Sequence, residues 1–403
     1  MAKKKQSIPQ YATTVIKGVE YYRTRIEDAD GKRVTLYART REELYSKVQA
    51  AQKEIAEAKF RKENPTVAEY CEKWLLMQSA KVSPATLKGY SNSMENYIIK
   101  PLGDMYMSDV TADDIRLALV PASKKSAGLY GKINMLIKCV FYSAERSQII
   151  DHNPTAGISA KGGTPAKGKA ALTDEQVKIL LDTVRDLPPY TFVMIGLFAG
   201  LRREEILALQ WDCVFLDVPT PYISVQRAWR TDHNRPVISN VLKTPAARRD
   251  VPIPKCLADR LREVKKNSIS QYVIADSNGE PLAASQFDRL WKYIKVRTAK
   301  DRTYYKYVNG QSIKYTVSAE LGASSRNNHN IVYSLDFDVT PHQLRHTYIT
   351  NLIAASVDPK TVQYLAGHEN SKTTMDIYAK VKYNKPSELA PVVNSAFIRE
   401  VGA

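Results

Sequence analysis

The fold of this chain is decided by the stretch from residue 340 to residue 380, in which ionisable side chains recur at close intervals. It contains TPHQLRHTY (340–348), AGHEN (366–370) and MDIYAK (375–380). Thr340 can cap a helix, and the proline that follows suits the first helical position. His342 and Arg345 are three residues apart, so they share one face of the predicted helix. This part of the stretch therefore predicts a short helix that presents an imidazole and a guanidinium group together.

Two more short helices are predicted downstream. Asp358, followed by a proline, can begin a helix, and Gly367 can end it in a left-handed conformation with His368 directly behind. Ser371 can cap the next helix, which carries Tyr378. Short capped helices with tight corners let one face of each converge. We therefore expect two nitrogen bases, a guanidinium group and a phenol in one site.

Length and composition narrow the class of protein. The 403 residues suffice for two or three domains, and the 44% hydrophobic content is ordinary for a globular protein. The sequence contains no run of about eighteen apolar residues that could span a membrane. The basic start is not followed by the apolar segment of a secretory signal. The four cysteines form no C-x-x-C pair, so neither a disulfide framework nor a zinc site is expected. We expect a cytoplasmic protein.

The formal charge of +17 and the pI near 9.5 indicate a polyanionic partner. Lysine and arginine are spread along the whole chain, and they bind nucleic acids by neutralising phosphates and releasing counterions. Membrane-surface binding is less favoured, because no basic amphipathic helix with a continuous apolar face stands out. The charge therefore predicts a nucleic acid as the partner, and no membrane.

Residues 1–64 are predicted to form a small unit of three strands and one helix. Two of the strands flank a turn at residues 28–31. Up to residue 62 the unit holds fifteen basic and eight acidic side chains. Arg23 and Arg25 point to one face of a strand, which favours a DNA-contacting sheet with Arg33 as a third candidate.

Residues 65–160 are predicted to form an all-helical bundle. Four helices are expected, with apolar residues at helical spacing. The candidate phosphate contacts on them are Lys88, Lys100, Lys124, Lys125, Lys132 and Lys138. Residues 161–170 are rich in glycine and lysine and are predicted to be a basic linker.

Residues 171–403 are predicted to form a mixed, mostly helical domain. Strands are expected near 222–228 and 249–253, with Lys243 in the loop or hairpin between them. Asn309-Gly310 separates two alternating, tyrosine-rich runs, which predicts a β-hairpin at 304–317 inside an insertion near 300–340. The expected fold class is thus multidomain and mainly α, with small β elements.

The charged residues of the last domain fit an in-line attack by Tyr378 on a phosphodiester. Two guanidinium forks would cover both non-bridging oxygens, and Arg345 and Arg202 can supply them. A glycine precedes Arg202 by two residues, so this arginine is expected near a helix N-terminus, which favours an anion. A phenol has a pKa of about 10 and needs a base, which His342 can provide. Lys243 can protonate the leaving 5′-alkoxide.

Five motifs in order resemble those of the tyrosine recombinases, also called the lambda-integrase family. They are GLRREEILAL (200–209), LKT with RRDVPI (242–244 and 248–253), TPHQLRHT (340–347), LAGH (365–368) and MDIY (375–378). By this resemblance Tyr378 is the nucleophile, assisted by Arg202, Lys243, His342, Arg345 and His368. One departure is Glu204, where the family usually has serine or glycine, while Glu205 keeps the expected acidic residue.

The amino-terminal parts fit the same resemblance. The bundle is similar to the family's core-binding domain, and the strand-and-helix unit is similar to the arm-binding domain of integrases from conjugative transposons. Arg248, beside the lysine segment, is a further candidate for DNA contact. The hairpin at 304–317 is additional to the minimal catalytic domain, and our hypothesis is that it packs against DNA or a neighbouring subunit.

The resemblance implies a site-specific recombinase of a mobile element that acts on double-stranded DNA as a homo-tetramer. It implies strand exchange through a 3′-phosphotyrosyl link and a four-way junction, for integration and excision, in the bacterial cytoplasm beside the nucleoid. No metal, other cofactor or ATP is expected, because the link conserves the phosphodiester energy. An excision factor is implied as a partner. The apolar tail at 386–403 is expected to dock on a neighbouring subunit.

Three other functions are compatible with parts of the sequence. A type IB topoisomerase would use similar chemistry but relax DNA without partner exchange. A non-catalytic DNA-binding regulator would keep the basic domains without needing Tyr378. A metal-dependent nuclease is least favoured, since no carboxylate cluster of ligand type appears. Each motif residue taken singly also has a structural interpretation, such as a satisfied histidine or a surface ion pair, so it is their combination that favours recombination.

Overall fold

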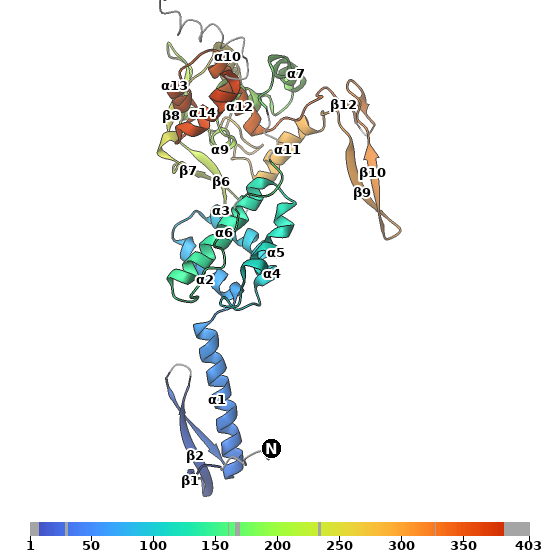
Figure 1. Cartoon of the computed structure of the whole chain (residues 1–403). Helices are drawn as coiled ribbons and strands as arrows, with labels where there is room; N and C mark the ends of the chain where they lie inside the picture. The colour runs from blue at the N-terminus through green and yellow to red at the C-terminus, as the bar shows by residue number, and fades with distance from the viewer. Residues whose placement is uncertain are drawn as a thin grey trace, which may run out of the picture. The chain divides into compact units, whose positions relative to one another are not determined.

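The computed structural model describes residues 8–28, 31–159, 161–165, 170–232, 235–326 and 328–382. The chain divides into two compact units, Met1–Gly168 and Lys169–Ala403 (Figure 1). The basic residues at the start and the apolar tail at 386–403 lie outside the described residues. None of the helices in the described ranges is long and apolar enough to cross a membrane.

A three-stranded antiparallel sheet begins the first unit. It is formed, in order, by β1 (Ala12–Ile16), β2 (Val19–Glu27) and β3 (Arg33–Ala38), and is followed by α1 (Arg41–Glu63) (Figure 1). Thr40 caps α1 by accepting a hydrogen bond from the Glu43 amide at 3.2 Å. Leu44 and Val48 bury the start of the helix against the sheet, whereas Ile55, further along the helix, is partly exposed. The predicted three strands and helix are confirmed.

The rest of the first unit is a helical bundle. Its helices are α2 (Val67–Ser79), α3 (Pro84–Met94), α4 (Lys100–Leu102), α5 (Ala112–Ser123) and α6 (Ala127–Arg146), with a π-helical turn at Glu95–Ile99. The long α6 lines the core with residues such as Ile133, Ile137 and Phe141, which are fully buried. Thr66, Ser83, Thr111 and Ser126 are the observed N-caps. The all-helical bundle expected from the apolar spacing is therefore present, and polar caps mark the starts of its longer helices.

Part of the glycine-rich stretch after the bundle packs on it. The Thr164 amide donates to the Lys125 carbonyl at 2.7 Å, and the Ala127 amide donates to the Thr164 carbonyl at 2.8 Å. A Cβ at Gly162 would lie 2.6 Å from the ring of Tyr130, so glycine is needed for this close approach. Composition alone gave no sign of these contacts.

The second unit is mostly helical. Its helices are α7 (Asp174–Val184), α8 (Tyr190–Phe198), α9 (Arg203–Leu207), α10 (Lys255–Lys266), α11 (Ala284–Lys295), α12 (Pro341–Ala354), α13 (Pro359–Ala366) and α14 (Ser371–Lys382). A sheet of order β4-β5-β8 consists of β4 (Val214–Phe215), β5 (Tyr222–Val225) and β8 (Arg249–Pro252). Helix α8 is buried almost all round and contacts α7, α10 and α12, so it forms the centre of this unit.

Three strand pairs lie outside that sheet. They are β6 (Ala228–Asp232) with β7 (Arg235–Ser239), β9 (Arg302–Val308) with β10 (Gln311–Val317), and β11 (Ser324–Ser325) with β12 (Asn328–Val332). The β6–β7 hairpin lies between the two predicted strands, where the sequence left a loop or a hairpin open, and half of its strand residues are exposed. The polar residues that follow the β9–β10 pair within the predicted insertion also contain paired strands, β11 and β12.

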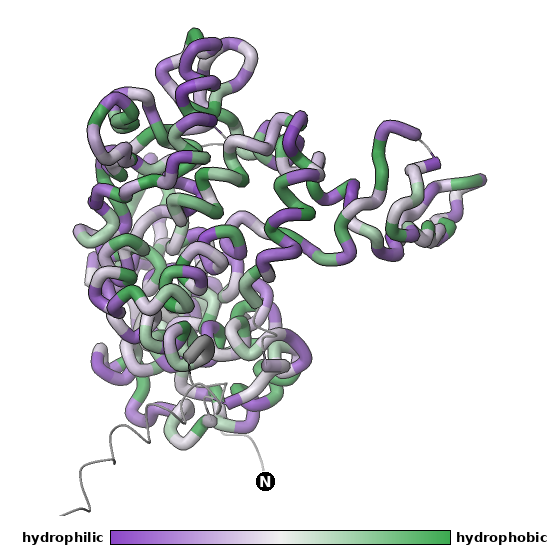
Figure 2. Tube along the Cα trace, turned by 90° about the horizontal axis from the view of Figure 1, so that it is seen from above, coloured by the Kyte–Doolittle hydropathy of each residue, from purple (hydrophilic) through white to green (hydrophobic). Residues whose placement is uncertain are grey.

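The predicted tyrosine-rich hairpin is present as β9–β10. Asn309 and Gly310 form its turn with φ of 50° and 78°, as a two-residue hairpin loop requires. Tyr304 and Tyr315 stack across the strands with ring centroids 5.5 Å apart. Tyr305 and Tyr307 are 65% and 81% exposed. The strands extend away from the rest of their unit (Figure 1), and the projecting part contains both hydrophilic and hydrophobic residues (Figure 2).

Candidate active site

Three helices, α12, α13 and α14, contact one another. Helix α12 carries His342 and Arg345, α14 carries Tyr378, and His368 follows the end of α13. Helix α12 starts at Pro341 as predicted, although the side chain of the preceding threonine makes no capping hydrogen bond. Asp358 caps α13 by accepting from the amides of the second and third helical residues, and Gly367 ends it with a φ of 59°. Helix α14 begins at Ser371 itself, and Asn370 is its cap, one residue earlier than predicted.

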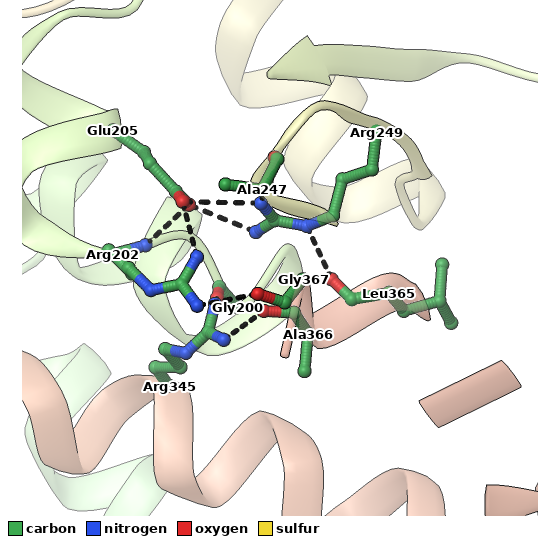
Figure 3. A network of polar contacts seen from close by, with 9 residues as sticks. All are labelled: Gly200, Arg202, Glu205, Ala247, Arg249, Arg345, Leu365, Ala366 and Gly367. Carbon is green, nitrogen blue, oxygen red and sulfur yellow. Dashed lines mark hydrogen bonds and ion pairs between the residues drawn. The ribbon is translucent and has the colours of Figure 1, made fainter. Parts of the chain in front are cut away.

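Arg345 is the most deeply buried of the predicted catalytic residues, with 1% of its surface exposed. Its Nη1 donates to the Gly200 carbonyl at 2.6 Å, and its Nη2 donates to the Ala366 carbonyl (Figure 3). Burial, together with the positive charge of Arg202, lowers the pKa of Arg345 to about 9. Gly200 has a φ of +63°, and a Cβ there would lie 2.1 Å from the ring of Tyr348. This glycine therefore lets the two motif segments meet.

Arg202 precedes α9 and reaches the same place from the other motif. Its Nη1 pairs with Glu205 at 2.7 Å, and its Nη2 donates to the Gly367 carbonyl at 2.6 Å (Figure 3). The side chain is 30% exposed. These contacts, like those of Arg345, occupy only part of each fork of N–H donors. Both guanidinium groups are thus fixed by protein oxygens while other donors remain for a ligand.

Glu205 is the carboxylate that binds two of the arginines of this site. Only 4% of it is exposed, and it accepts hydrogen bonds from both Arg202 and Arg249. Burial alone would raise the pKa of Glu205, but Arg249 and Arg202 outweigh it and lower that pKa to about 2. Arg202 and Arg249 therefore share one carboxylate, and Arg345 acts on it only through its charge, so the described network has an excess of positive charge.

Sequence reasoning missed the role of Arg249. The motif pattern included it only as a neighbour of Lys243, whereas the structure buries its side chain completely. A signal was present, because Arg249 and Val251 alternate with two exposed residues along β8. An arginine on the buried face of a short strand must have partners inside the protein.

The two motif histidines are held in the neutral form. Burial lowers the pKa of His342, and Arg345 lowers it further. For His368, burial and the charges of Arg345 and Arg202 lower the pKa to about 4. At neutral pH each imidazole therefore has one nitrogen that can donate a hydrogen bond and one that can accept one.

A hydrogen bond links His368 to the helix that carries Tyr378. The His368 Nδ1 lies 2.9 Å from the Oγ1 of Thr374, which is 1% exposed. Thr374 and Tyr378 are four residues apart on α14, so they lie on the same helix face. The Tyr378 side chain is partly buried and packs against the core of the unit. The structure thus brings this helix face to the histidine and, through Gly367, to the arginine pair.

Lys243 is placed differently from the other motif residues. It is exposed on the loop that follows β7, next to a hollow lined by residues that include Thr244 and Arg248. Arg248 is also exposed, and its Nη2 donates weakly to the Asn240 carbonyl at 3.4 Å. The loop ends at the buried Ala247, whose carbonyl belongs to the arginine network (Figure 3).

The remaining DNA-contact candidates lie in the first unit. Arg23 and Arg25 are exposed on one face of the sheet, and the register places Arg33 on that face too, where it pairs with Glu27 at 3.5 Å. Of the candidate lysines of the bundle, Lys88, Lys100, Lys124 and Lys125 are exposed.

Two bundle lysines have a structural contact instead of a fully exposed ammonium group. Lys132 Nζ donates to the Gly89 carbonyl at 2.6 Å, and Lys138 Nζ donates to the Ile158 carbonyl at 2.7 Å. Each therefore joins α6 to another segment. In the part of the chain that the structure describes, no group of three histidine, cysteine, aspartate or glutamate residues is placed to hold a metal ion.

Comparison with known proteins identifies the family of this arrangement. The profile of the phage integrase family matches residues 170–385, which is more than half of the chain. The chain belongs to the phage integrase family. The profile named "Phage integrase, N-terminal SAM-like domain" matches residues 66–118, within the helical bundle. The predicted family, the tyrosine recombinases of the kind found in conjugative elements, is confirmed, as is the predicted fold class.

Individual relatives agree with this membership. An integrase of Streptomyces ambofaciens is 23% identical over 83% of this chain and 79% of its own length. The ICEBs1 integrase of Bacillus subtilis is 25% identical over 73% of this chain and 75% of its own.

Solved structures of integrases share the fold. The Tn1549 transposon integrase in complex with a circular intermediate DNA has a TM-score of 0.63 and 20% identity, and covers 82% of this chain and 99% of that one. A lambda integrase tetramer bound to a Holliday junction has a TM-score of 0.53 and 16% identity, and covers 91% of this chain and 97% of that one.

Proposed function

We propose that this integrase cuts and rejoins double-stranded DNA with Tyr378 as its nucleophile, and so integrates and excises a mobile element. The observation that carries the proposal is the excess of buried positive charge at the arginine network. Three guanidinium groups around one carboxylate, beside two neutral imidazoles, need a further anion in a protein interior. A phosphodiester supplies that anion, and Arg202 and Arg345 retain N–H donors for its non-bridging oxygens.

The chemical step follows from these roles. The Tyr378 phenolic oxygen attacks phosphorus while the bond from phosphorus to the 5′-oxygen breaks, and the protein becomes joined to the 3′-phosphate. His342, neutral at pH 7, accepts the phenol proton, and Lys243 gives a proton to the departing 5′-oxygen. Arg202, Arg345 and His368 hold the phosphate oxygens. Attack by the 5′-hydroxyl of a partner duplex reverses the step and completes strand exchange through a four-way junction.

The proposed division of labour assigns the rest of the chain to DNA binding. Residues 1–64 bind arm-type sites, residues 65–160 bind core-type sites, residues 161–170 link them to the catalytic domain, and residues 171–403 form that domain with its tail. The proposed phosphate contacts are those named above on the sheet, on the bundle and on the loop that carries Lys243. Two solved relatives are bound to DNA, one of them as a tetramer. We extend this to a homo-tetramer on DNA, with an excision factor as partner, in the bacterial cytoplasm.

A nicked suicide duplex carrying candidate element ends tests the proposal. Loss of the short fragment beyond the nick should trap a covalent adduct on Tyr378, formed equally well in chelator. Tyr378→Phe should bind the duplex with unchanged affinity and form no adduct. An adduct mapped to another residue, or none with any variant, would refute the assignment. Supercoil relaxation without recombinant products would instead indicate a topoisomerase.

A further inference from the structure

Arg249 is enclosed by protein on every side, whereas the preceding residue, Arg248, is exposed. Its Nε donates to the Leu365 carbonyl at 2.7 Å, its Nη1 donates to the Ala247 carbonyl at 2.8 Å and to Glu205 at 3.2 Å, and its Nη2 donates to Glu205 at 2.9 Å (Figure 3). Its side chain is 0% exposed. With nearly all of its N–H donors used, Arg249 cannot itself hold a DNA phosphate.

The partners of Arg249 come from three separate parts of the sequence. Glu205 also holds Arg202, so the two arginines share one carboxylate. Leu365 lies two residues before Gly367, whose carbonyl accepts from Arg202 and whose neighbour is His368. A Cβ at Gly367 would lie 2.8 Å from the Arg249 Nη1, so the glycine permits this approach. Arg249 thus joins α9 to the end of α13.

The third partner connects this network to the lysine loop. Ala247 is four residues after Lys243 and is 3% exposed, whereas the loop residues around Lys243 are open to solvent. The other end of the loop is held at Val241, whose carbonyl accepts from Arg230 at 2.7 Å. The contact between Ala247 and Arg249 therefore fixes the loop with respect to the residues that bind phosphate.

We propose that Arg249 is a positioning residue that holds the loop carrying Lys243 in a fixed place relative to Arg202 and Arg345. The inference rests on the proposed function, in which Lys243 is the acid for the leaving oxygen. A buried ion pair is seldom needed for stability alone, because apolar groups of similar size often stabilise a fold as well. A planar fork that binds a carboxylate and two carbonyls at once defines geometry, which a lysine cannot reproduce.

The test compares two scissile groups in the same nicked duplex, one with the natural 5′-oxygen and one with sulfur at that bridging position. A thiolate is a far weaker base than an alkoxide, so its departure needs no acid. The full-length chain and its Arg249→Gln, Arg249→Lys and Lys243→Ala variants are compared by single-turnover cleavage at saturating protein. DNA affinity is measured on the same duplex.

Both Arg249 variants should cleave the oxygen substrate about 100-fold more slowly, within the range that a general acid contributes. The sulfur substrate should restore them to within about 3-fold of the unaltered chain, as it restores Lys243→Ala, with DNA affinity unchanged. Arg249→Lys keeps a positive charge beside Glu205, so this variant can still be tested if the glutamine variant fails to fold. Arg262→Gln is the control, because Arg262 also bonds a carboxylate and a carbonyl but is outside the network, and it should cleave both substrates normally.

Other outcomes overturn the proposal in distinct ways. An equal loss on oxygen and sulfur would mean that Arg249 supports the arginine pair or the fold, and not the lysine loop. Full activity of both variants would mean that the contact to Ala247 positions nothing. If the unaltered chain itself formed no adduct on Tyr378, the proposed function would fail instead.

Discussion

Replacing Glu205 with glutamine perturbs the site at the one group that balances its arginines. The side chain keeps its size, but it loses its charge and one acceptor oxygen. Arg249, which is 0% exposed, then has no counter-charge among its described contacts, and Arg202 loses its ion pair. We expect the variant to fold less stably and to cleave DNA poorly.

The magnitude follows from the pKa of the carboxyl group. The pKa of Glu205 falls from 4.5 to about 2 on folding. This difference corresponds to about 3 kcal/mol of stability. Breaking a buried ion pair generally costs about 3–5 kcal/mol, which agrees with this value. Because only 4% of Glu205 is exposed, solvent screening does not reduce the figure much.

The contribution of Glu205 to the free energy of unfolding should decrease as the pH falls. A carboxyl group with a depressed pKa contributes all of its stability above pH 4.5, and loses it as pH falls toward 2. The difference in unfolding free energy between the two proteins should therefore stay constant from pH 7 to pH 5. It should shrink to about 2 kcal/mol at pH 3.5, because the unaltered chain then gains less from ionisation.

Urea unfolding followed by tryptophan fluorescence measures this difference, since Trp211, Trp229 and Trp291 all lie in the second unit. Glu204→Gln is the matched control. Glu204 pairs with Arg203 at the surface, with side chains 42% and 44% exposed, so its loss should cost less than about 1 kcal/mol. Equal losses for both variants, or a difference that does not change with pH, would refute the reasoning.

Three further predictions concern other parts of the second unit. As pH falls from 6.5 toward 4, the unaltered protein should lose stability relative to His368→Gln. The reason is that the imidazole of His368 becomes protonated in the unfolded state, whereas in the folded state its pKa is about 4. Unfolding midpoints of the two proteins that move in parallel with pH would contradict this. Gly200→Ala should cost about 2–4 kcal/mol in urea unfolding, since its Cβ would overlap the Tyr348 ring, and a loss below about 1 kcal/mol would show that the contact relaxes. Replacing residues 303–316 with a short turn should leave the unfolding midpoint unchanged, because these residues are exposed and Arg302, which bonds carbonyls at the carboxyl end of α11, is kept, but should reduce strand exchange on gels; normal synapsis and product yield would count against a role for the hairpin.

The sequence determined the local elements and the order of the motifs. Capping residues such as Thr66, Thr111 and Asp358 mark helix starts because their side chains satisfy amides within a few residues. Asn309-Gly310 determined a hairpin turn for a similar reason, since few residues adopt its backbone angles. These interactions are short-range, so the sequence contains all the partners that they need. The family could be predicted because several such motifs occur in one order.

Only the tertiary structure decided which charges are buried and what they bind. Arg248 and Arg249 are adjacent and chemically identical, yet one is exposed and the other contacts residues up to 116 positions away in the chain. The low pKa values of His368 and Glu205 likewise depend on guanidinium groups from other segments. Burial and Coulomb interaction depend on distance in space, and that distance is set by the packing of helices around α8, which no local pattern specifies.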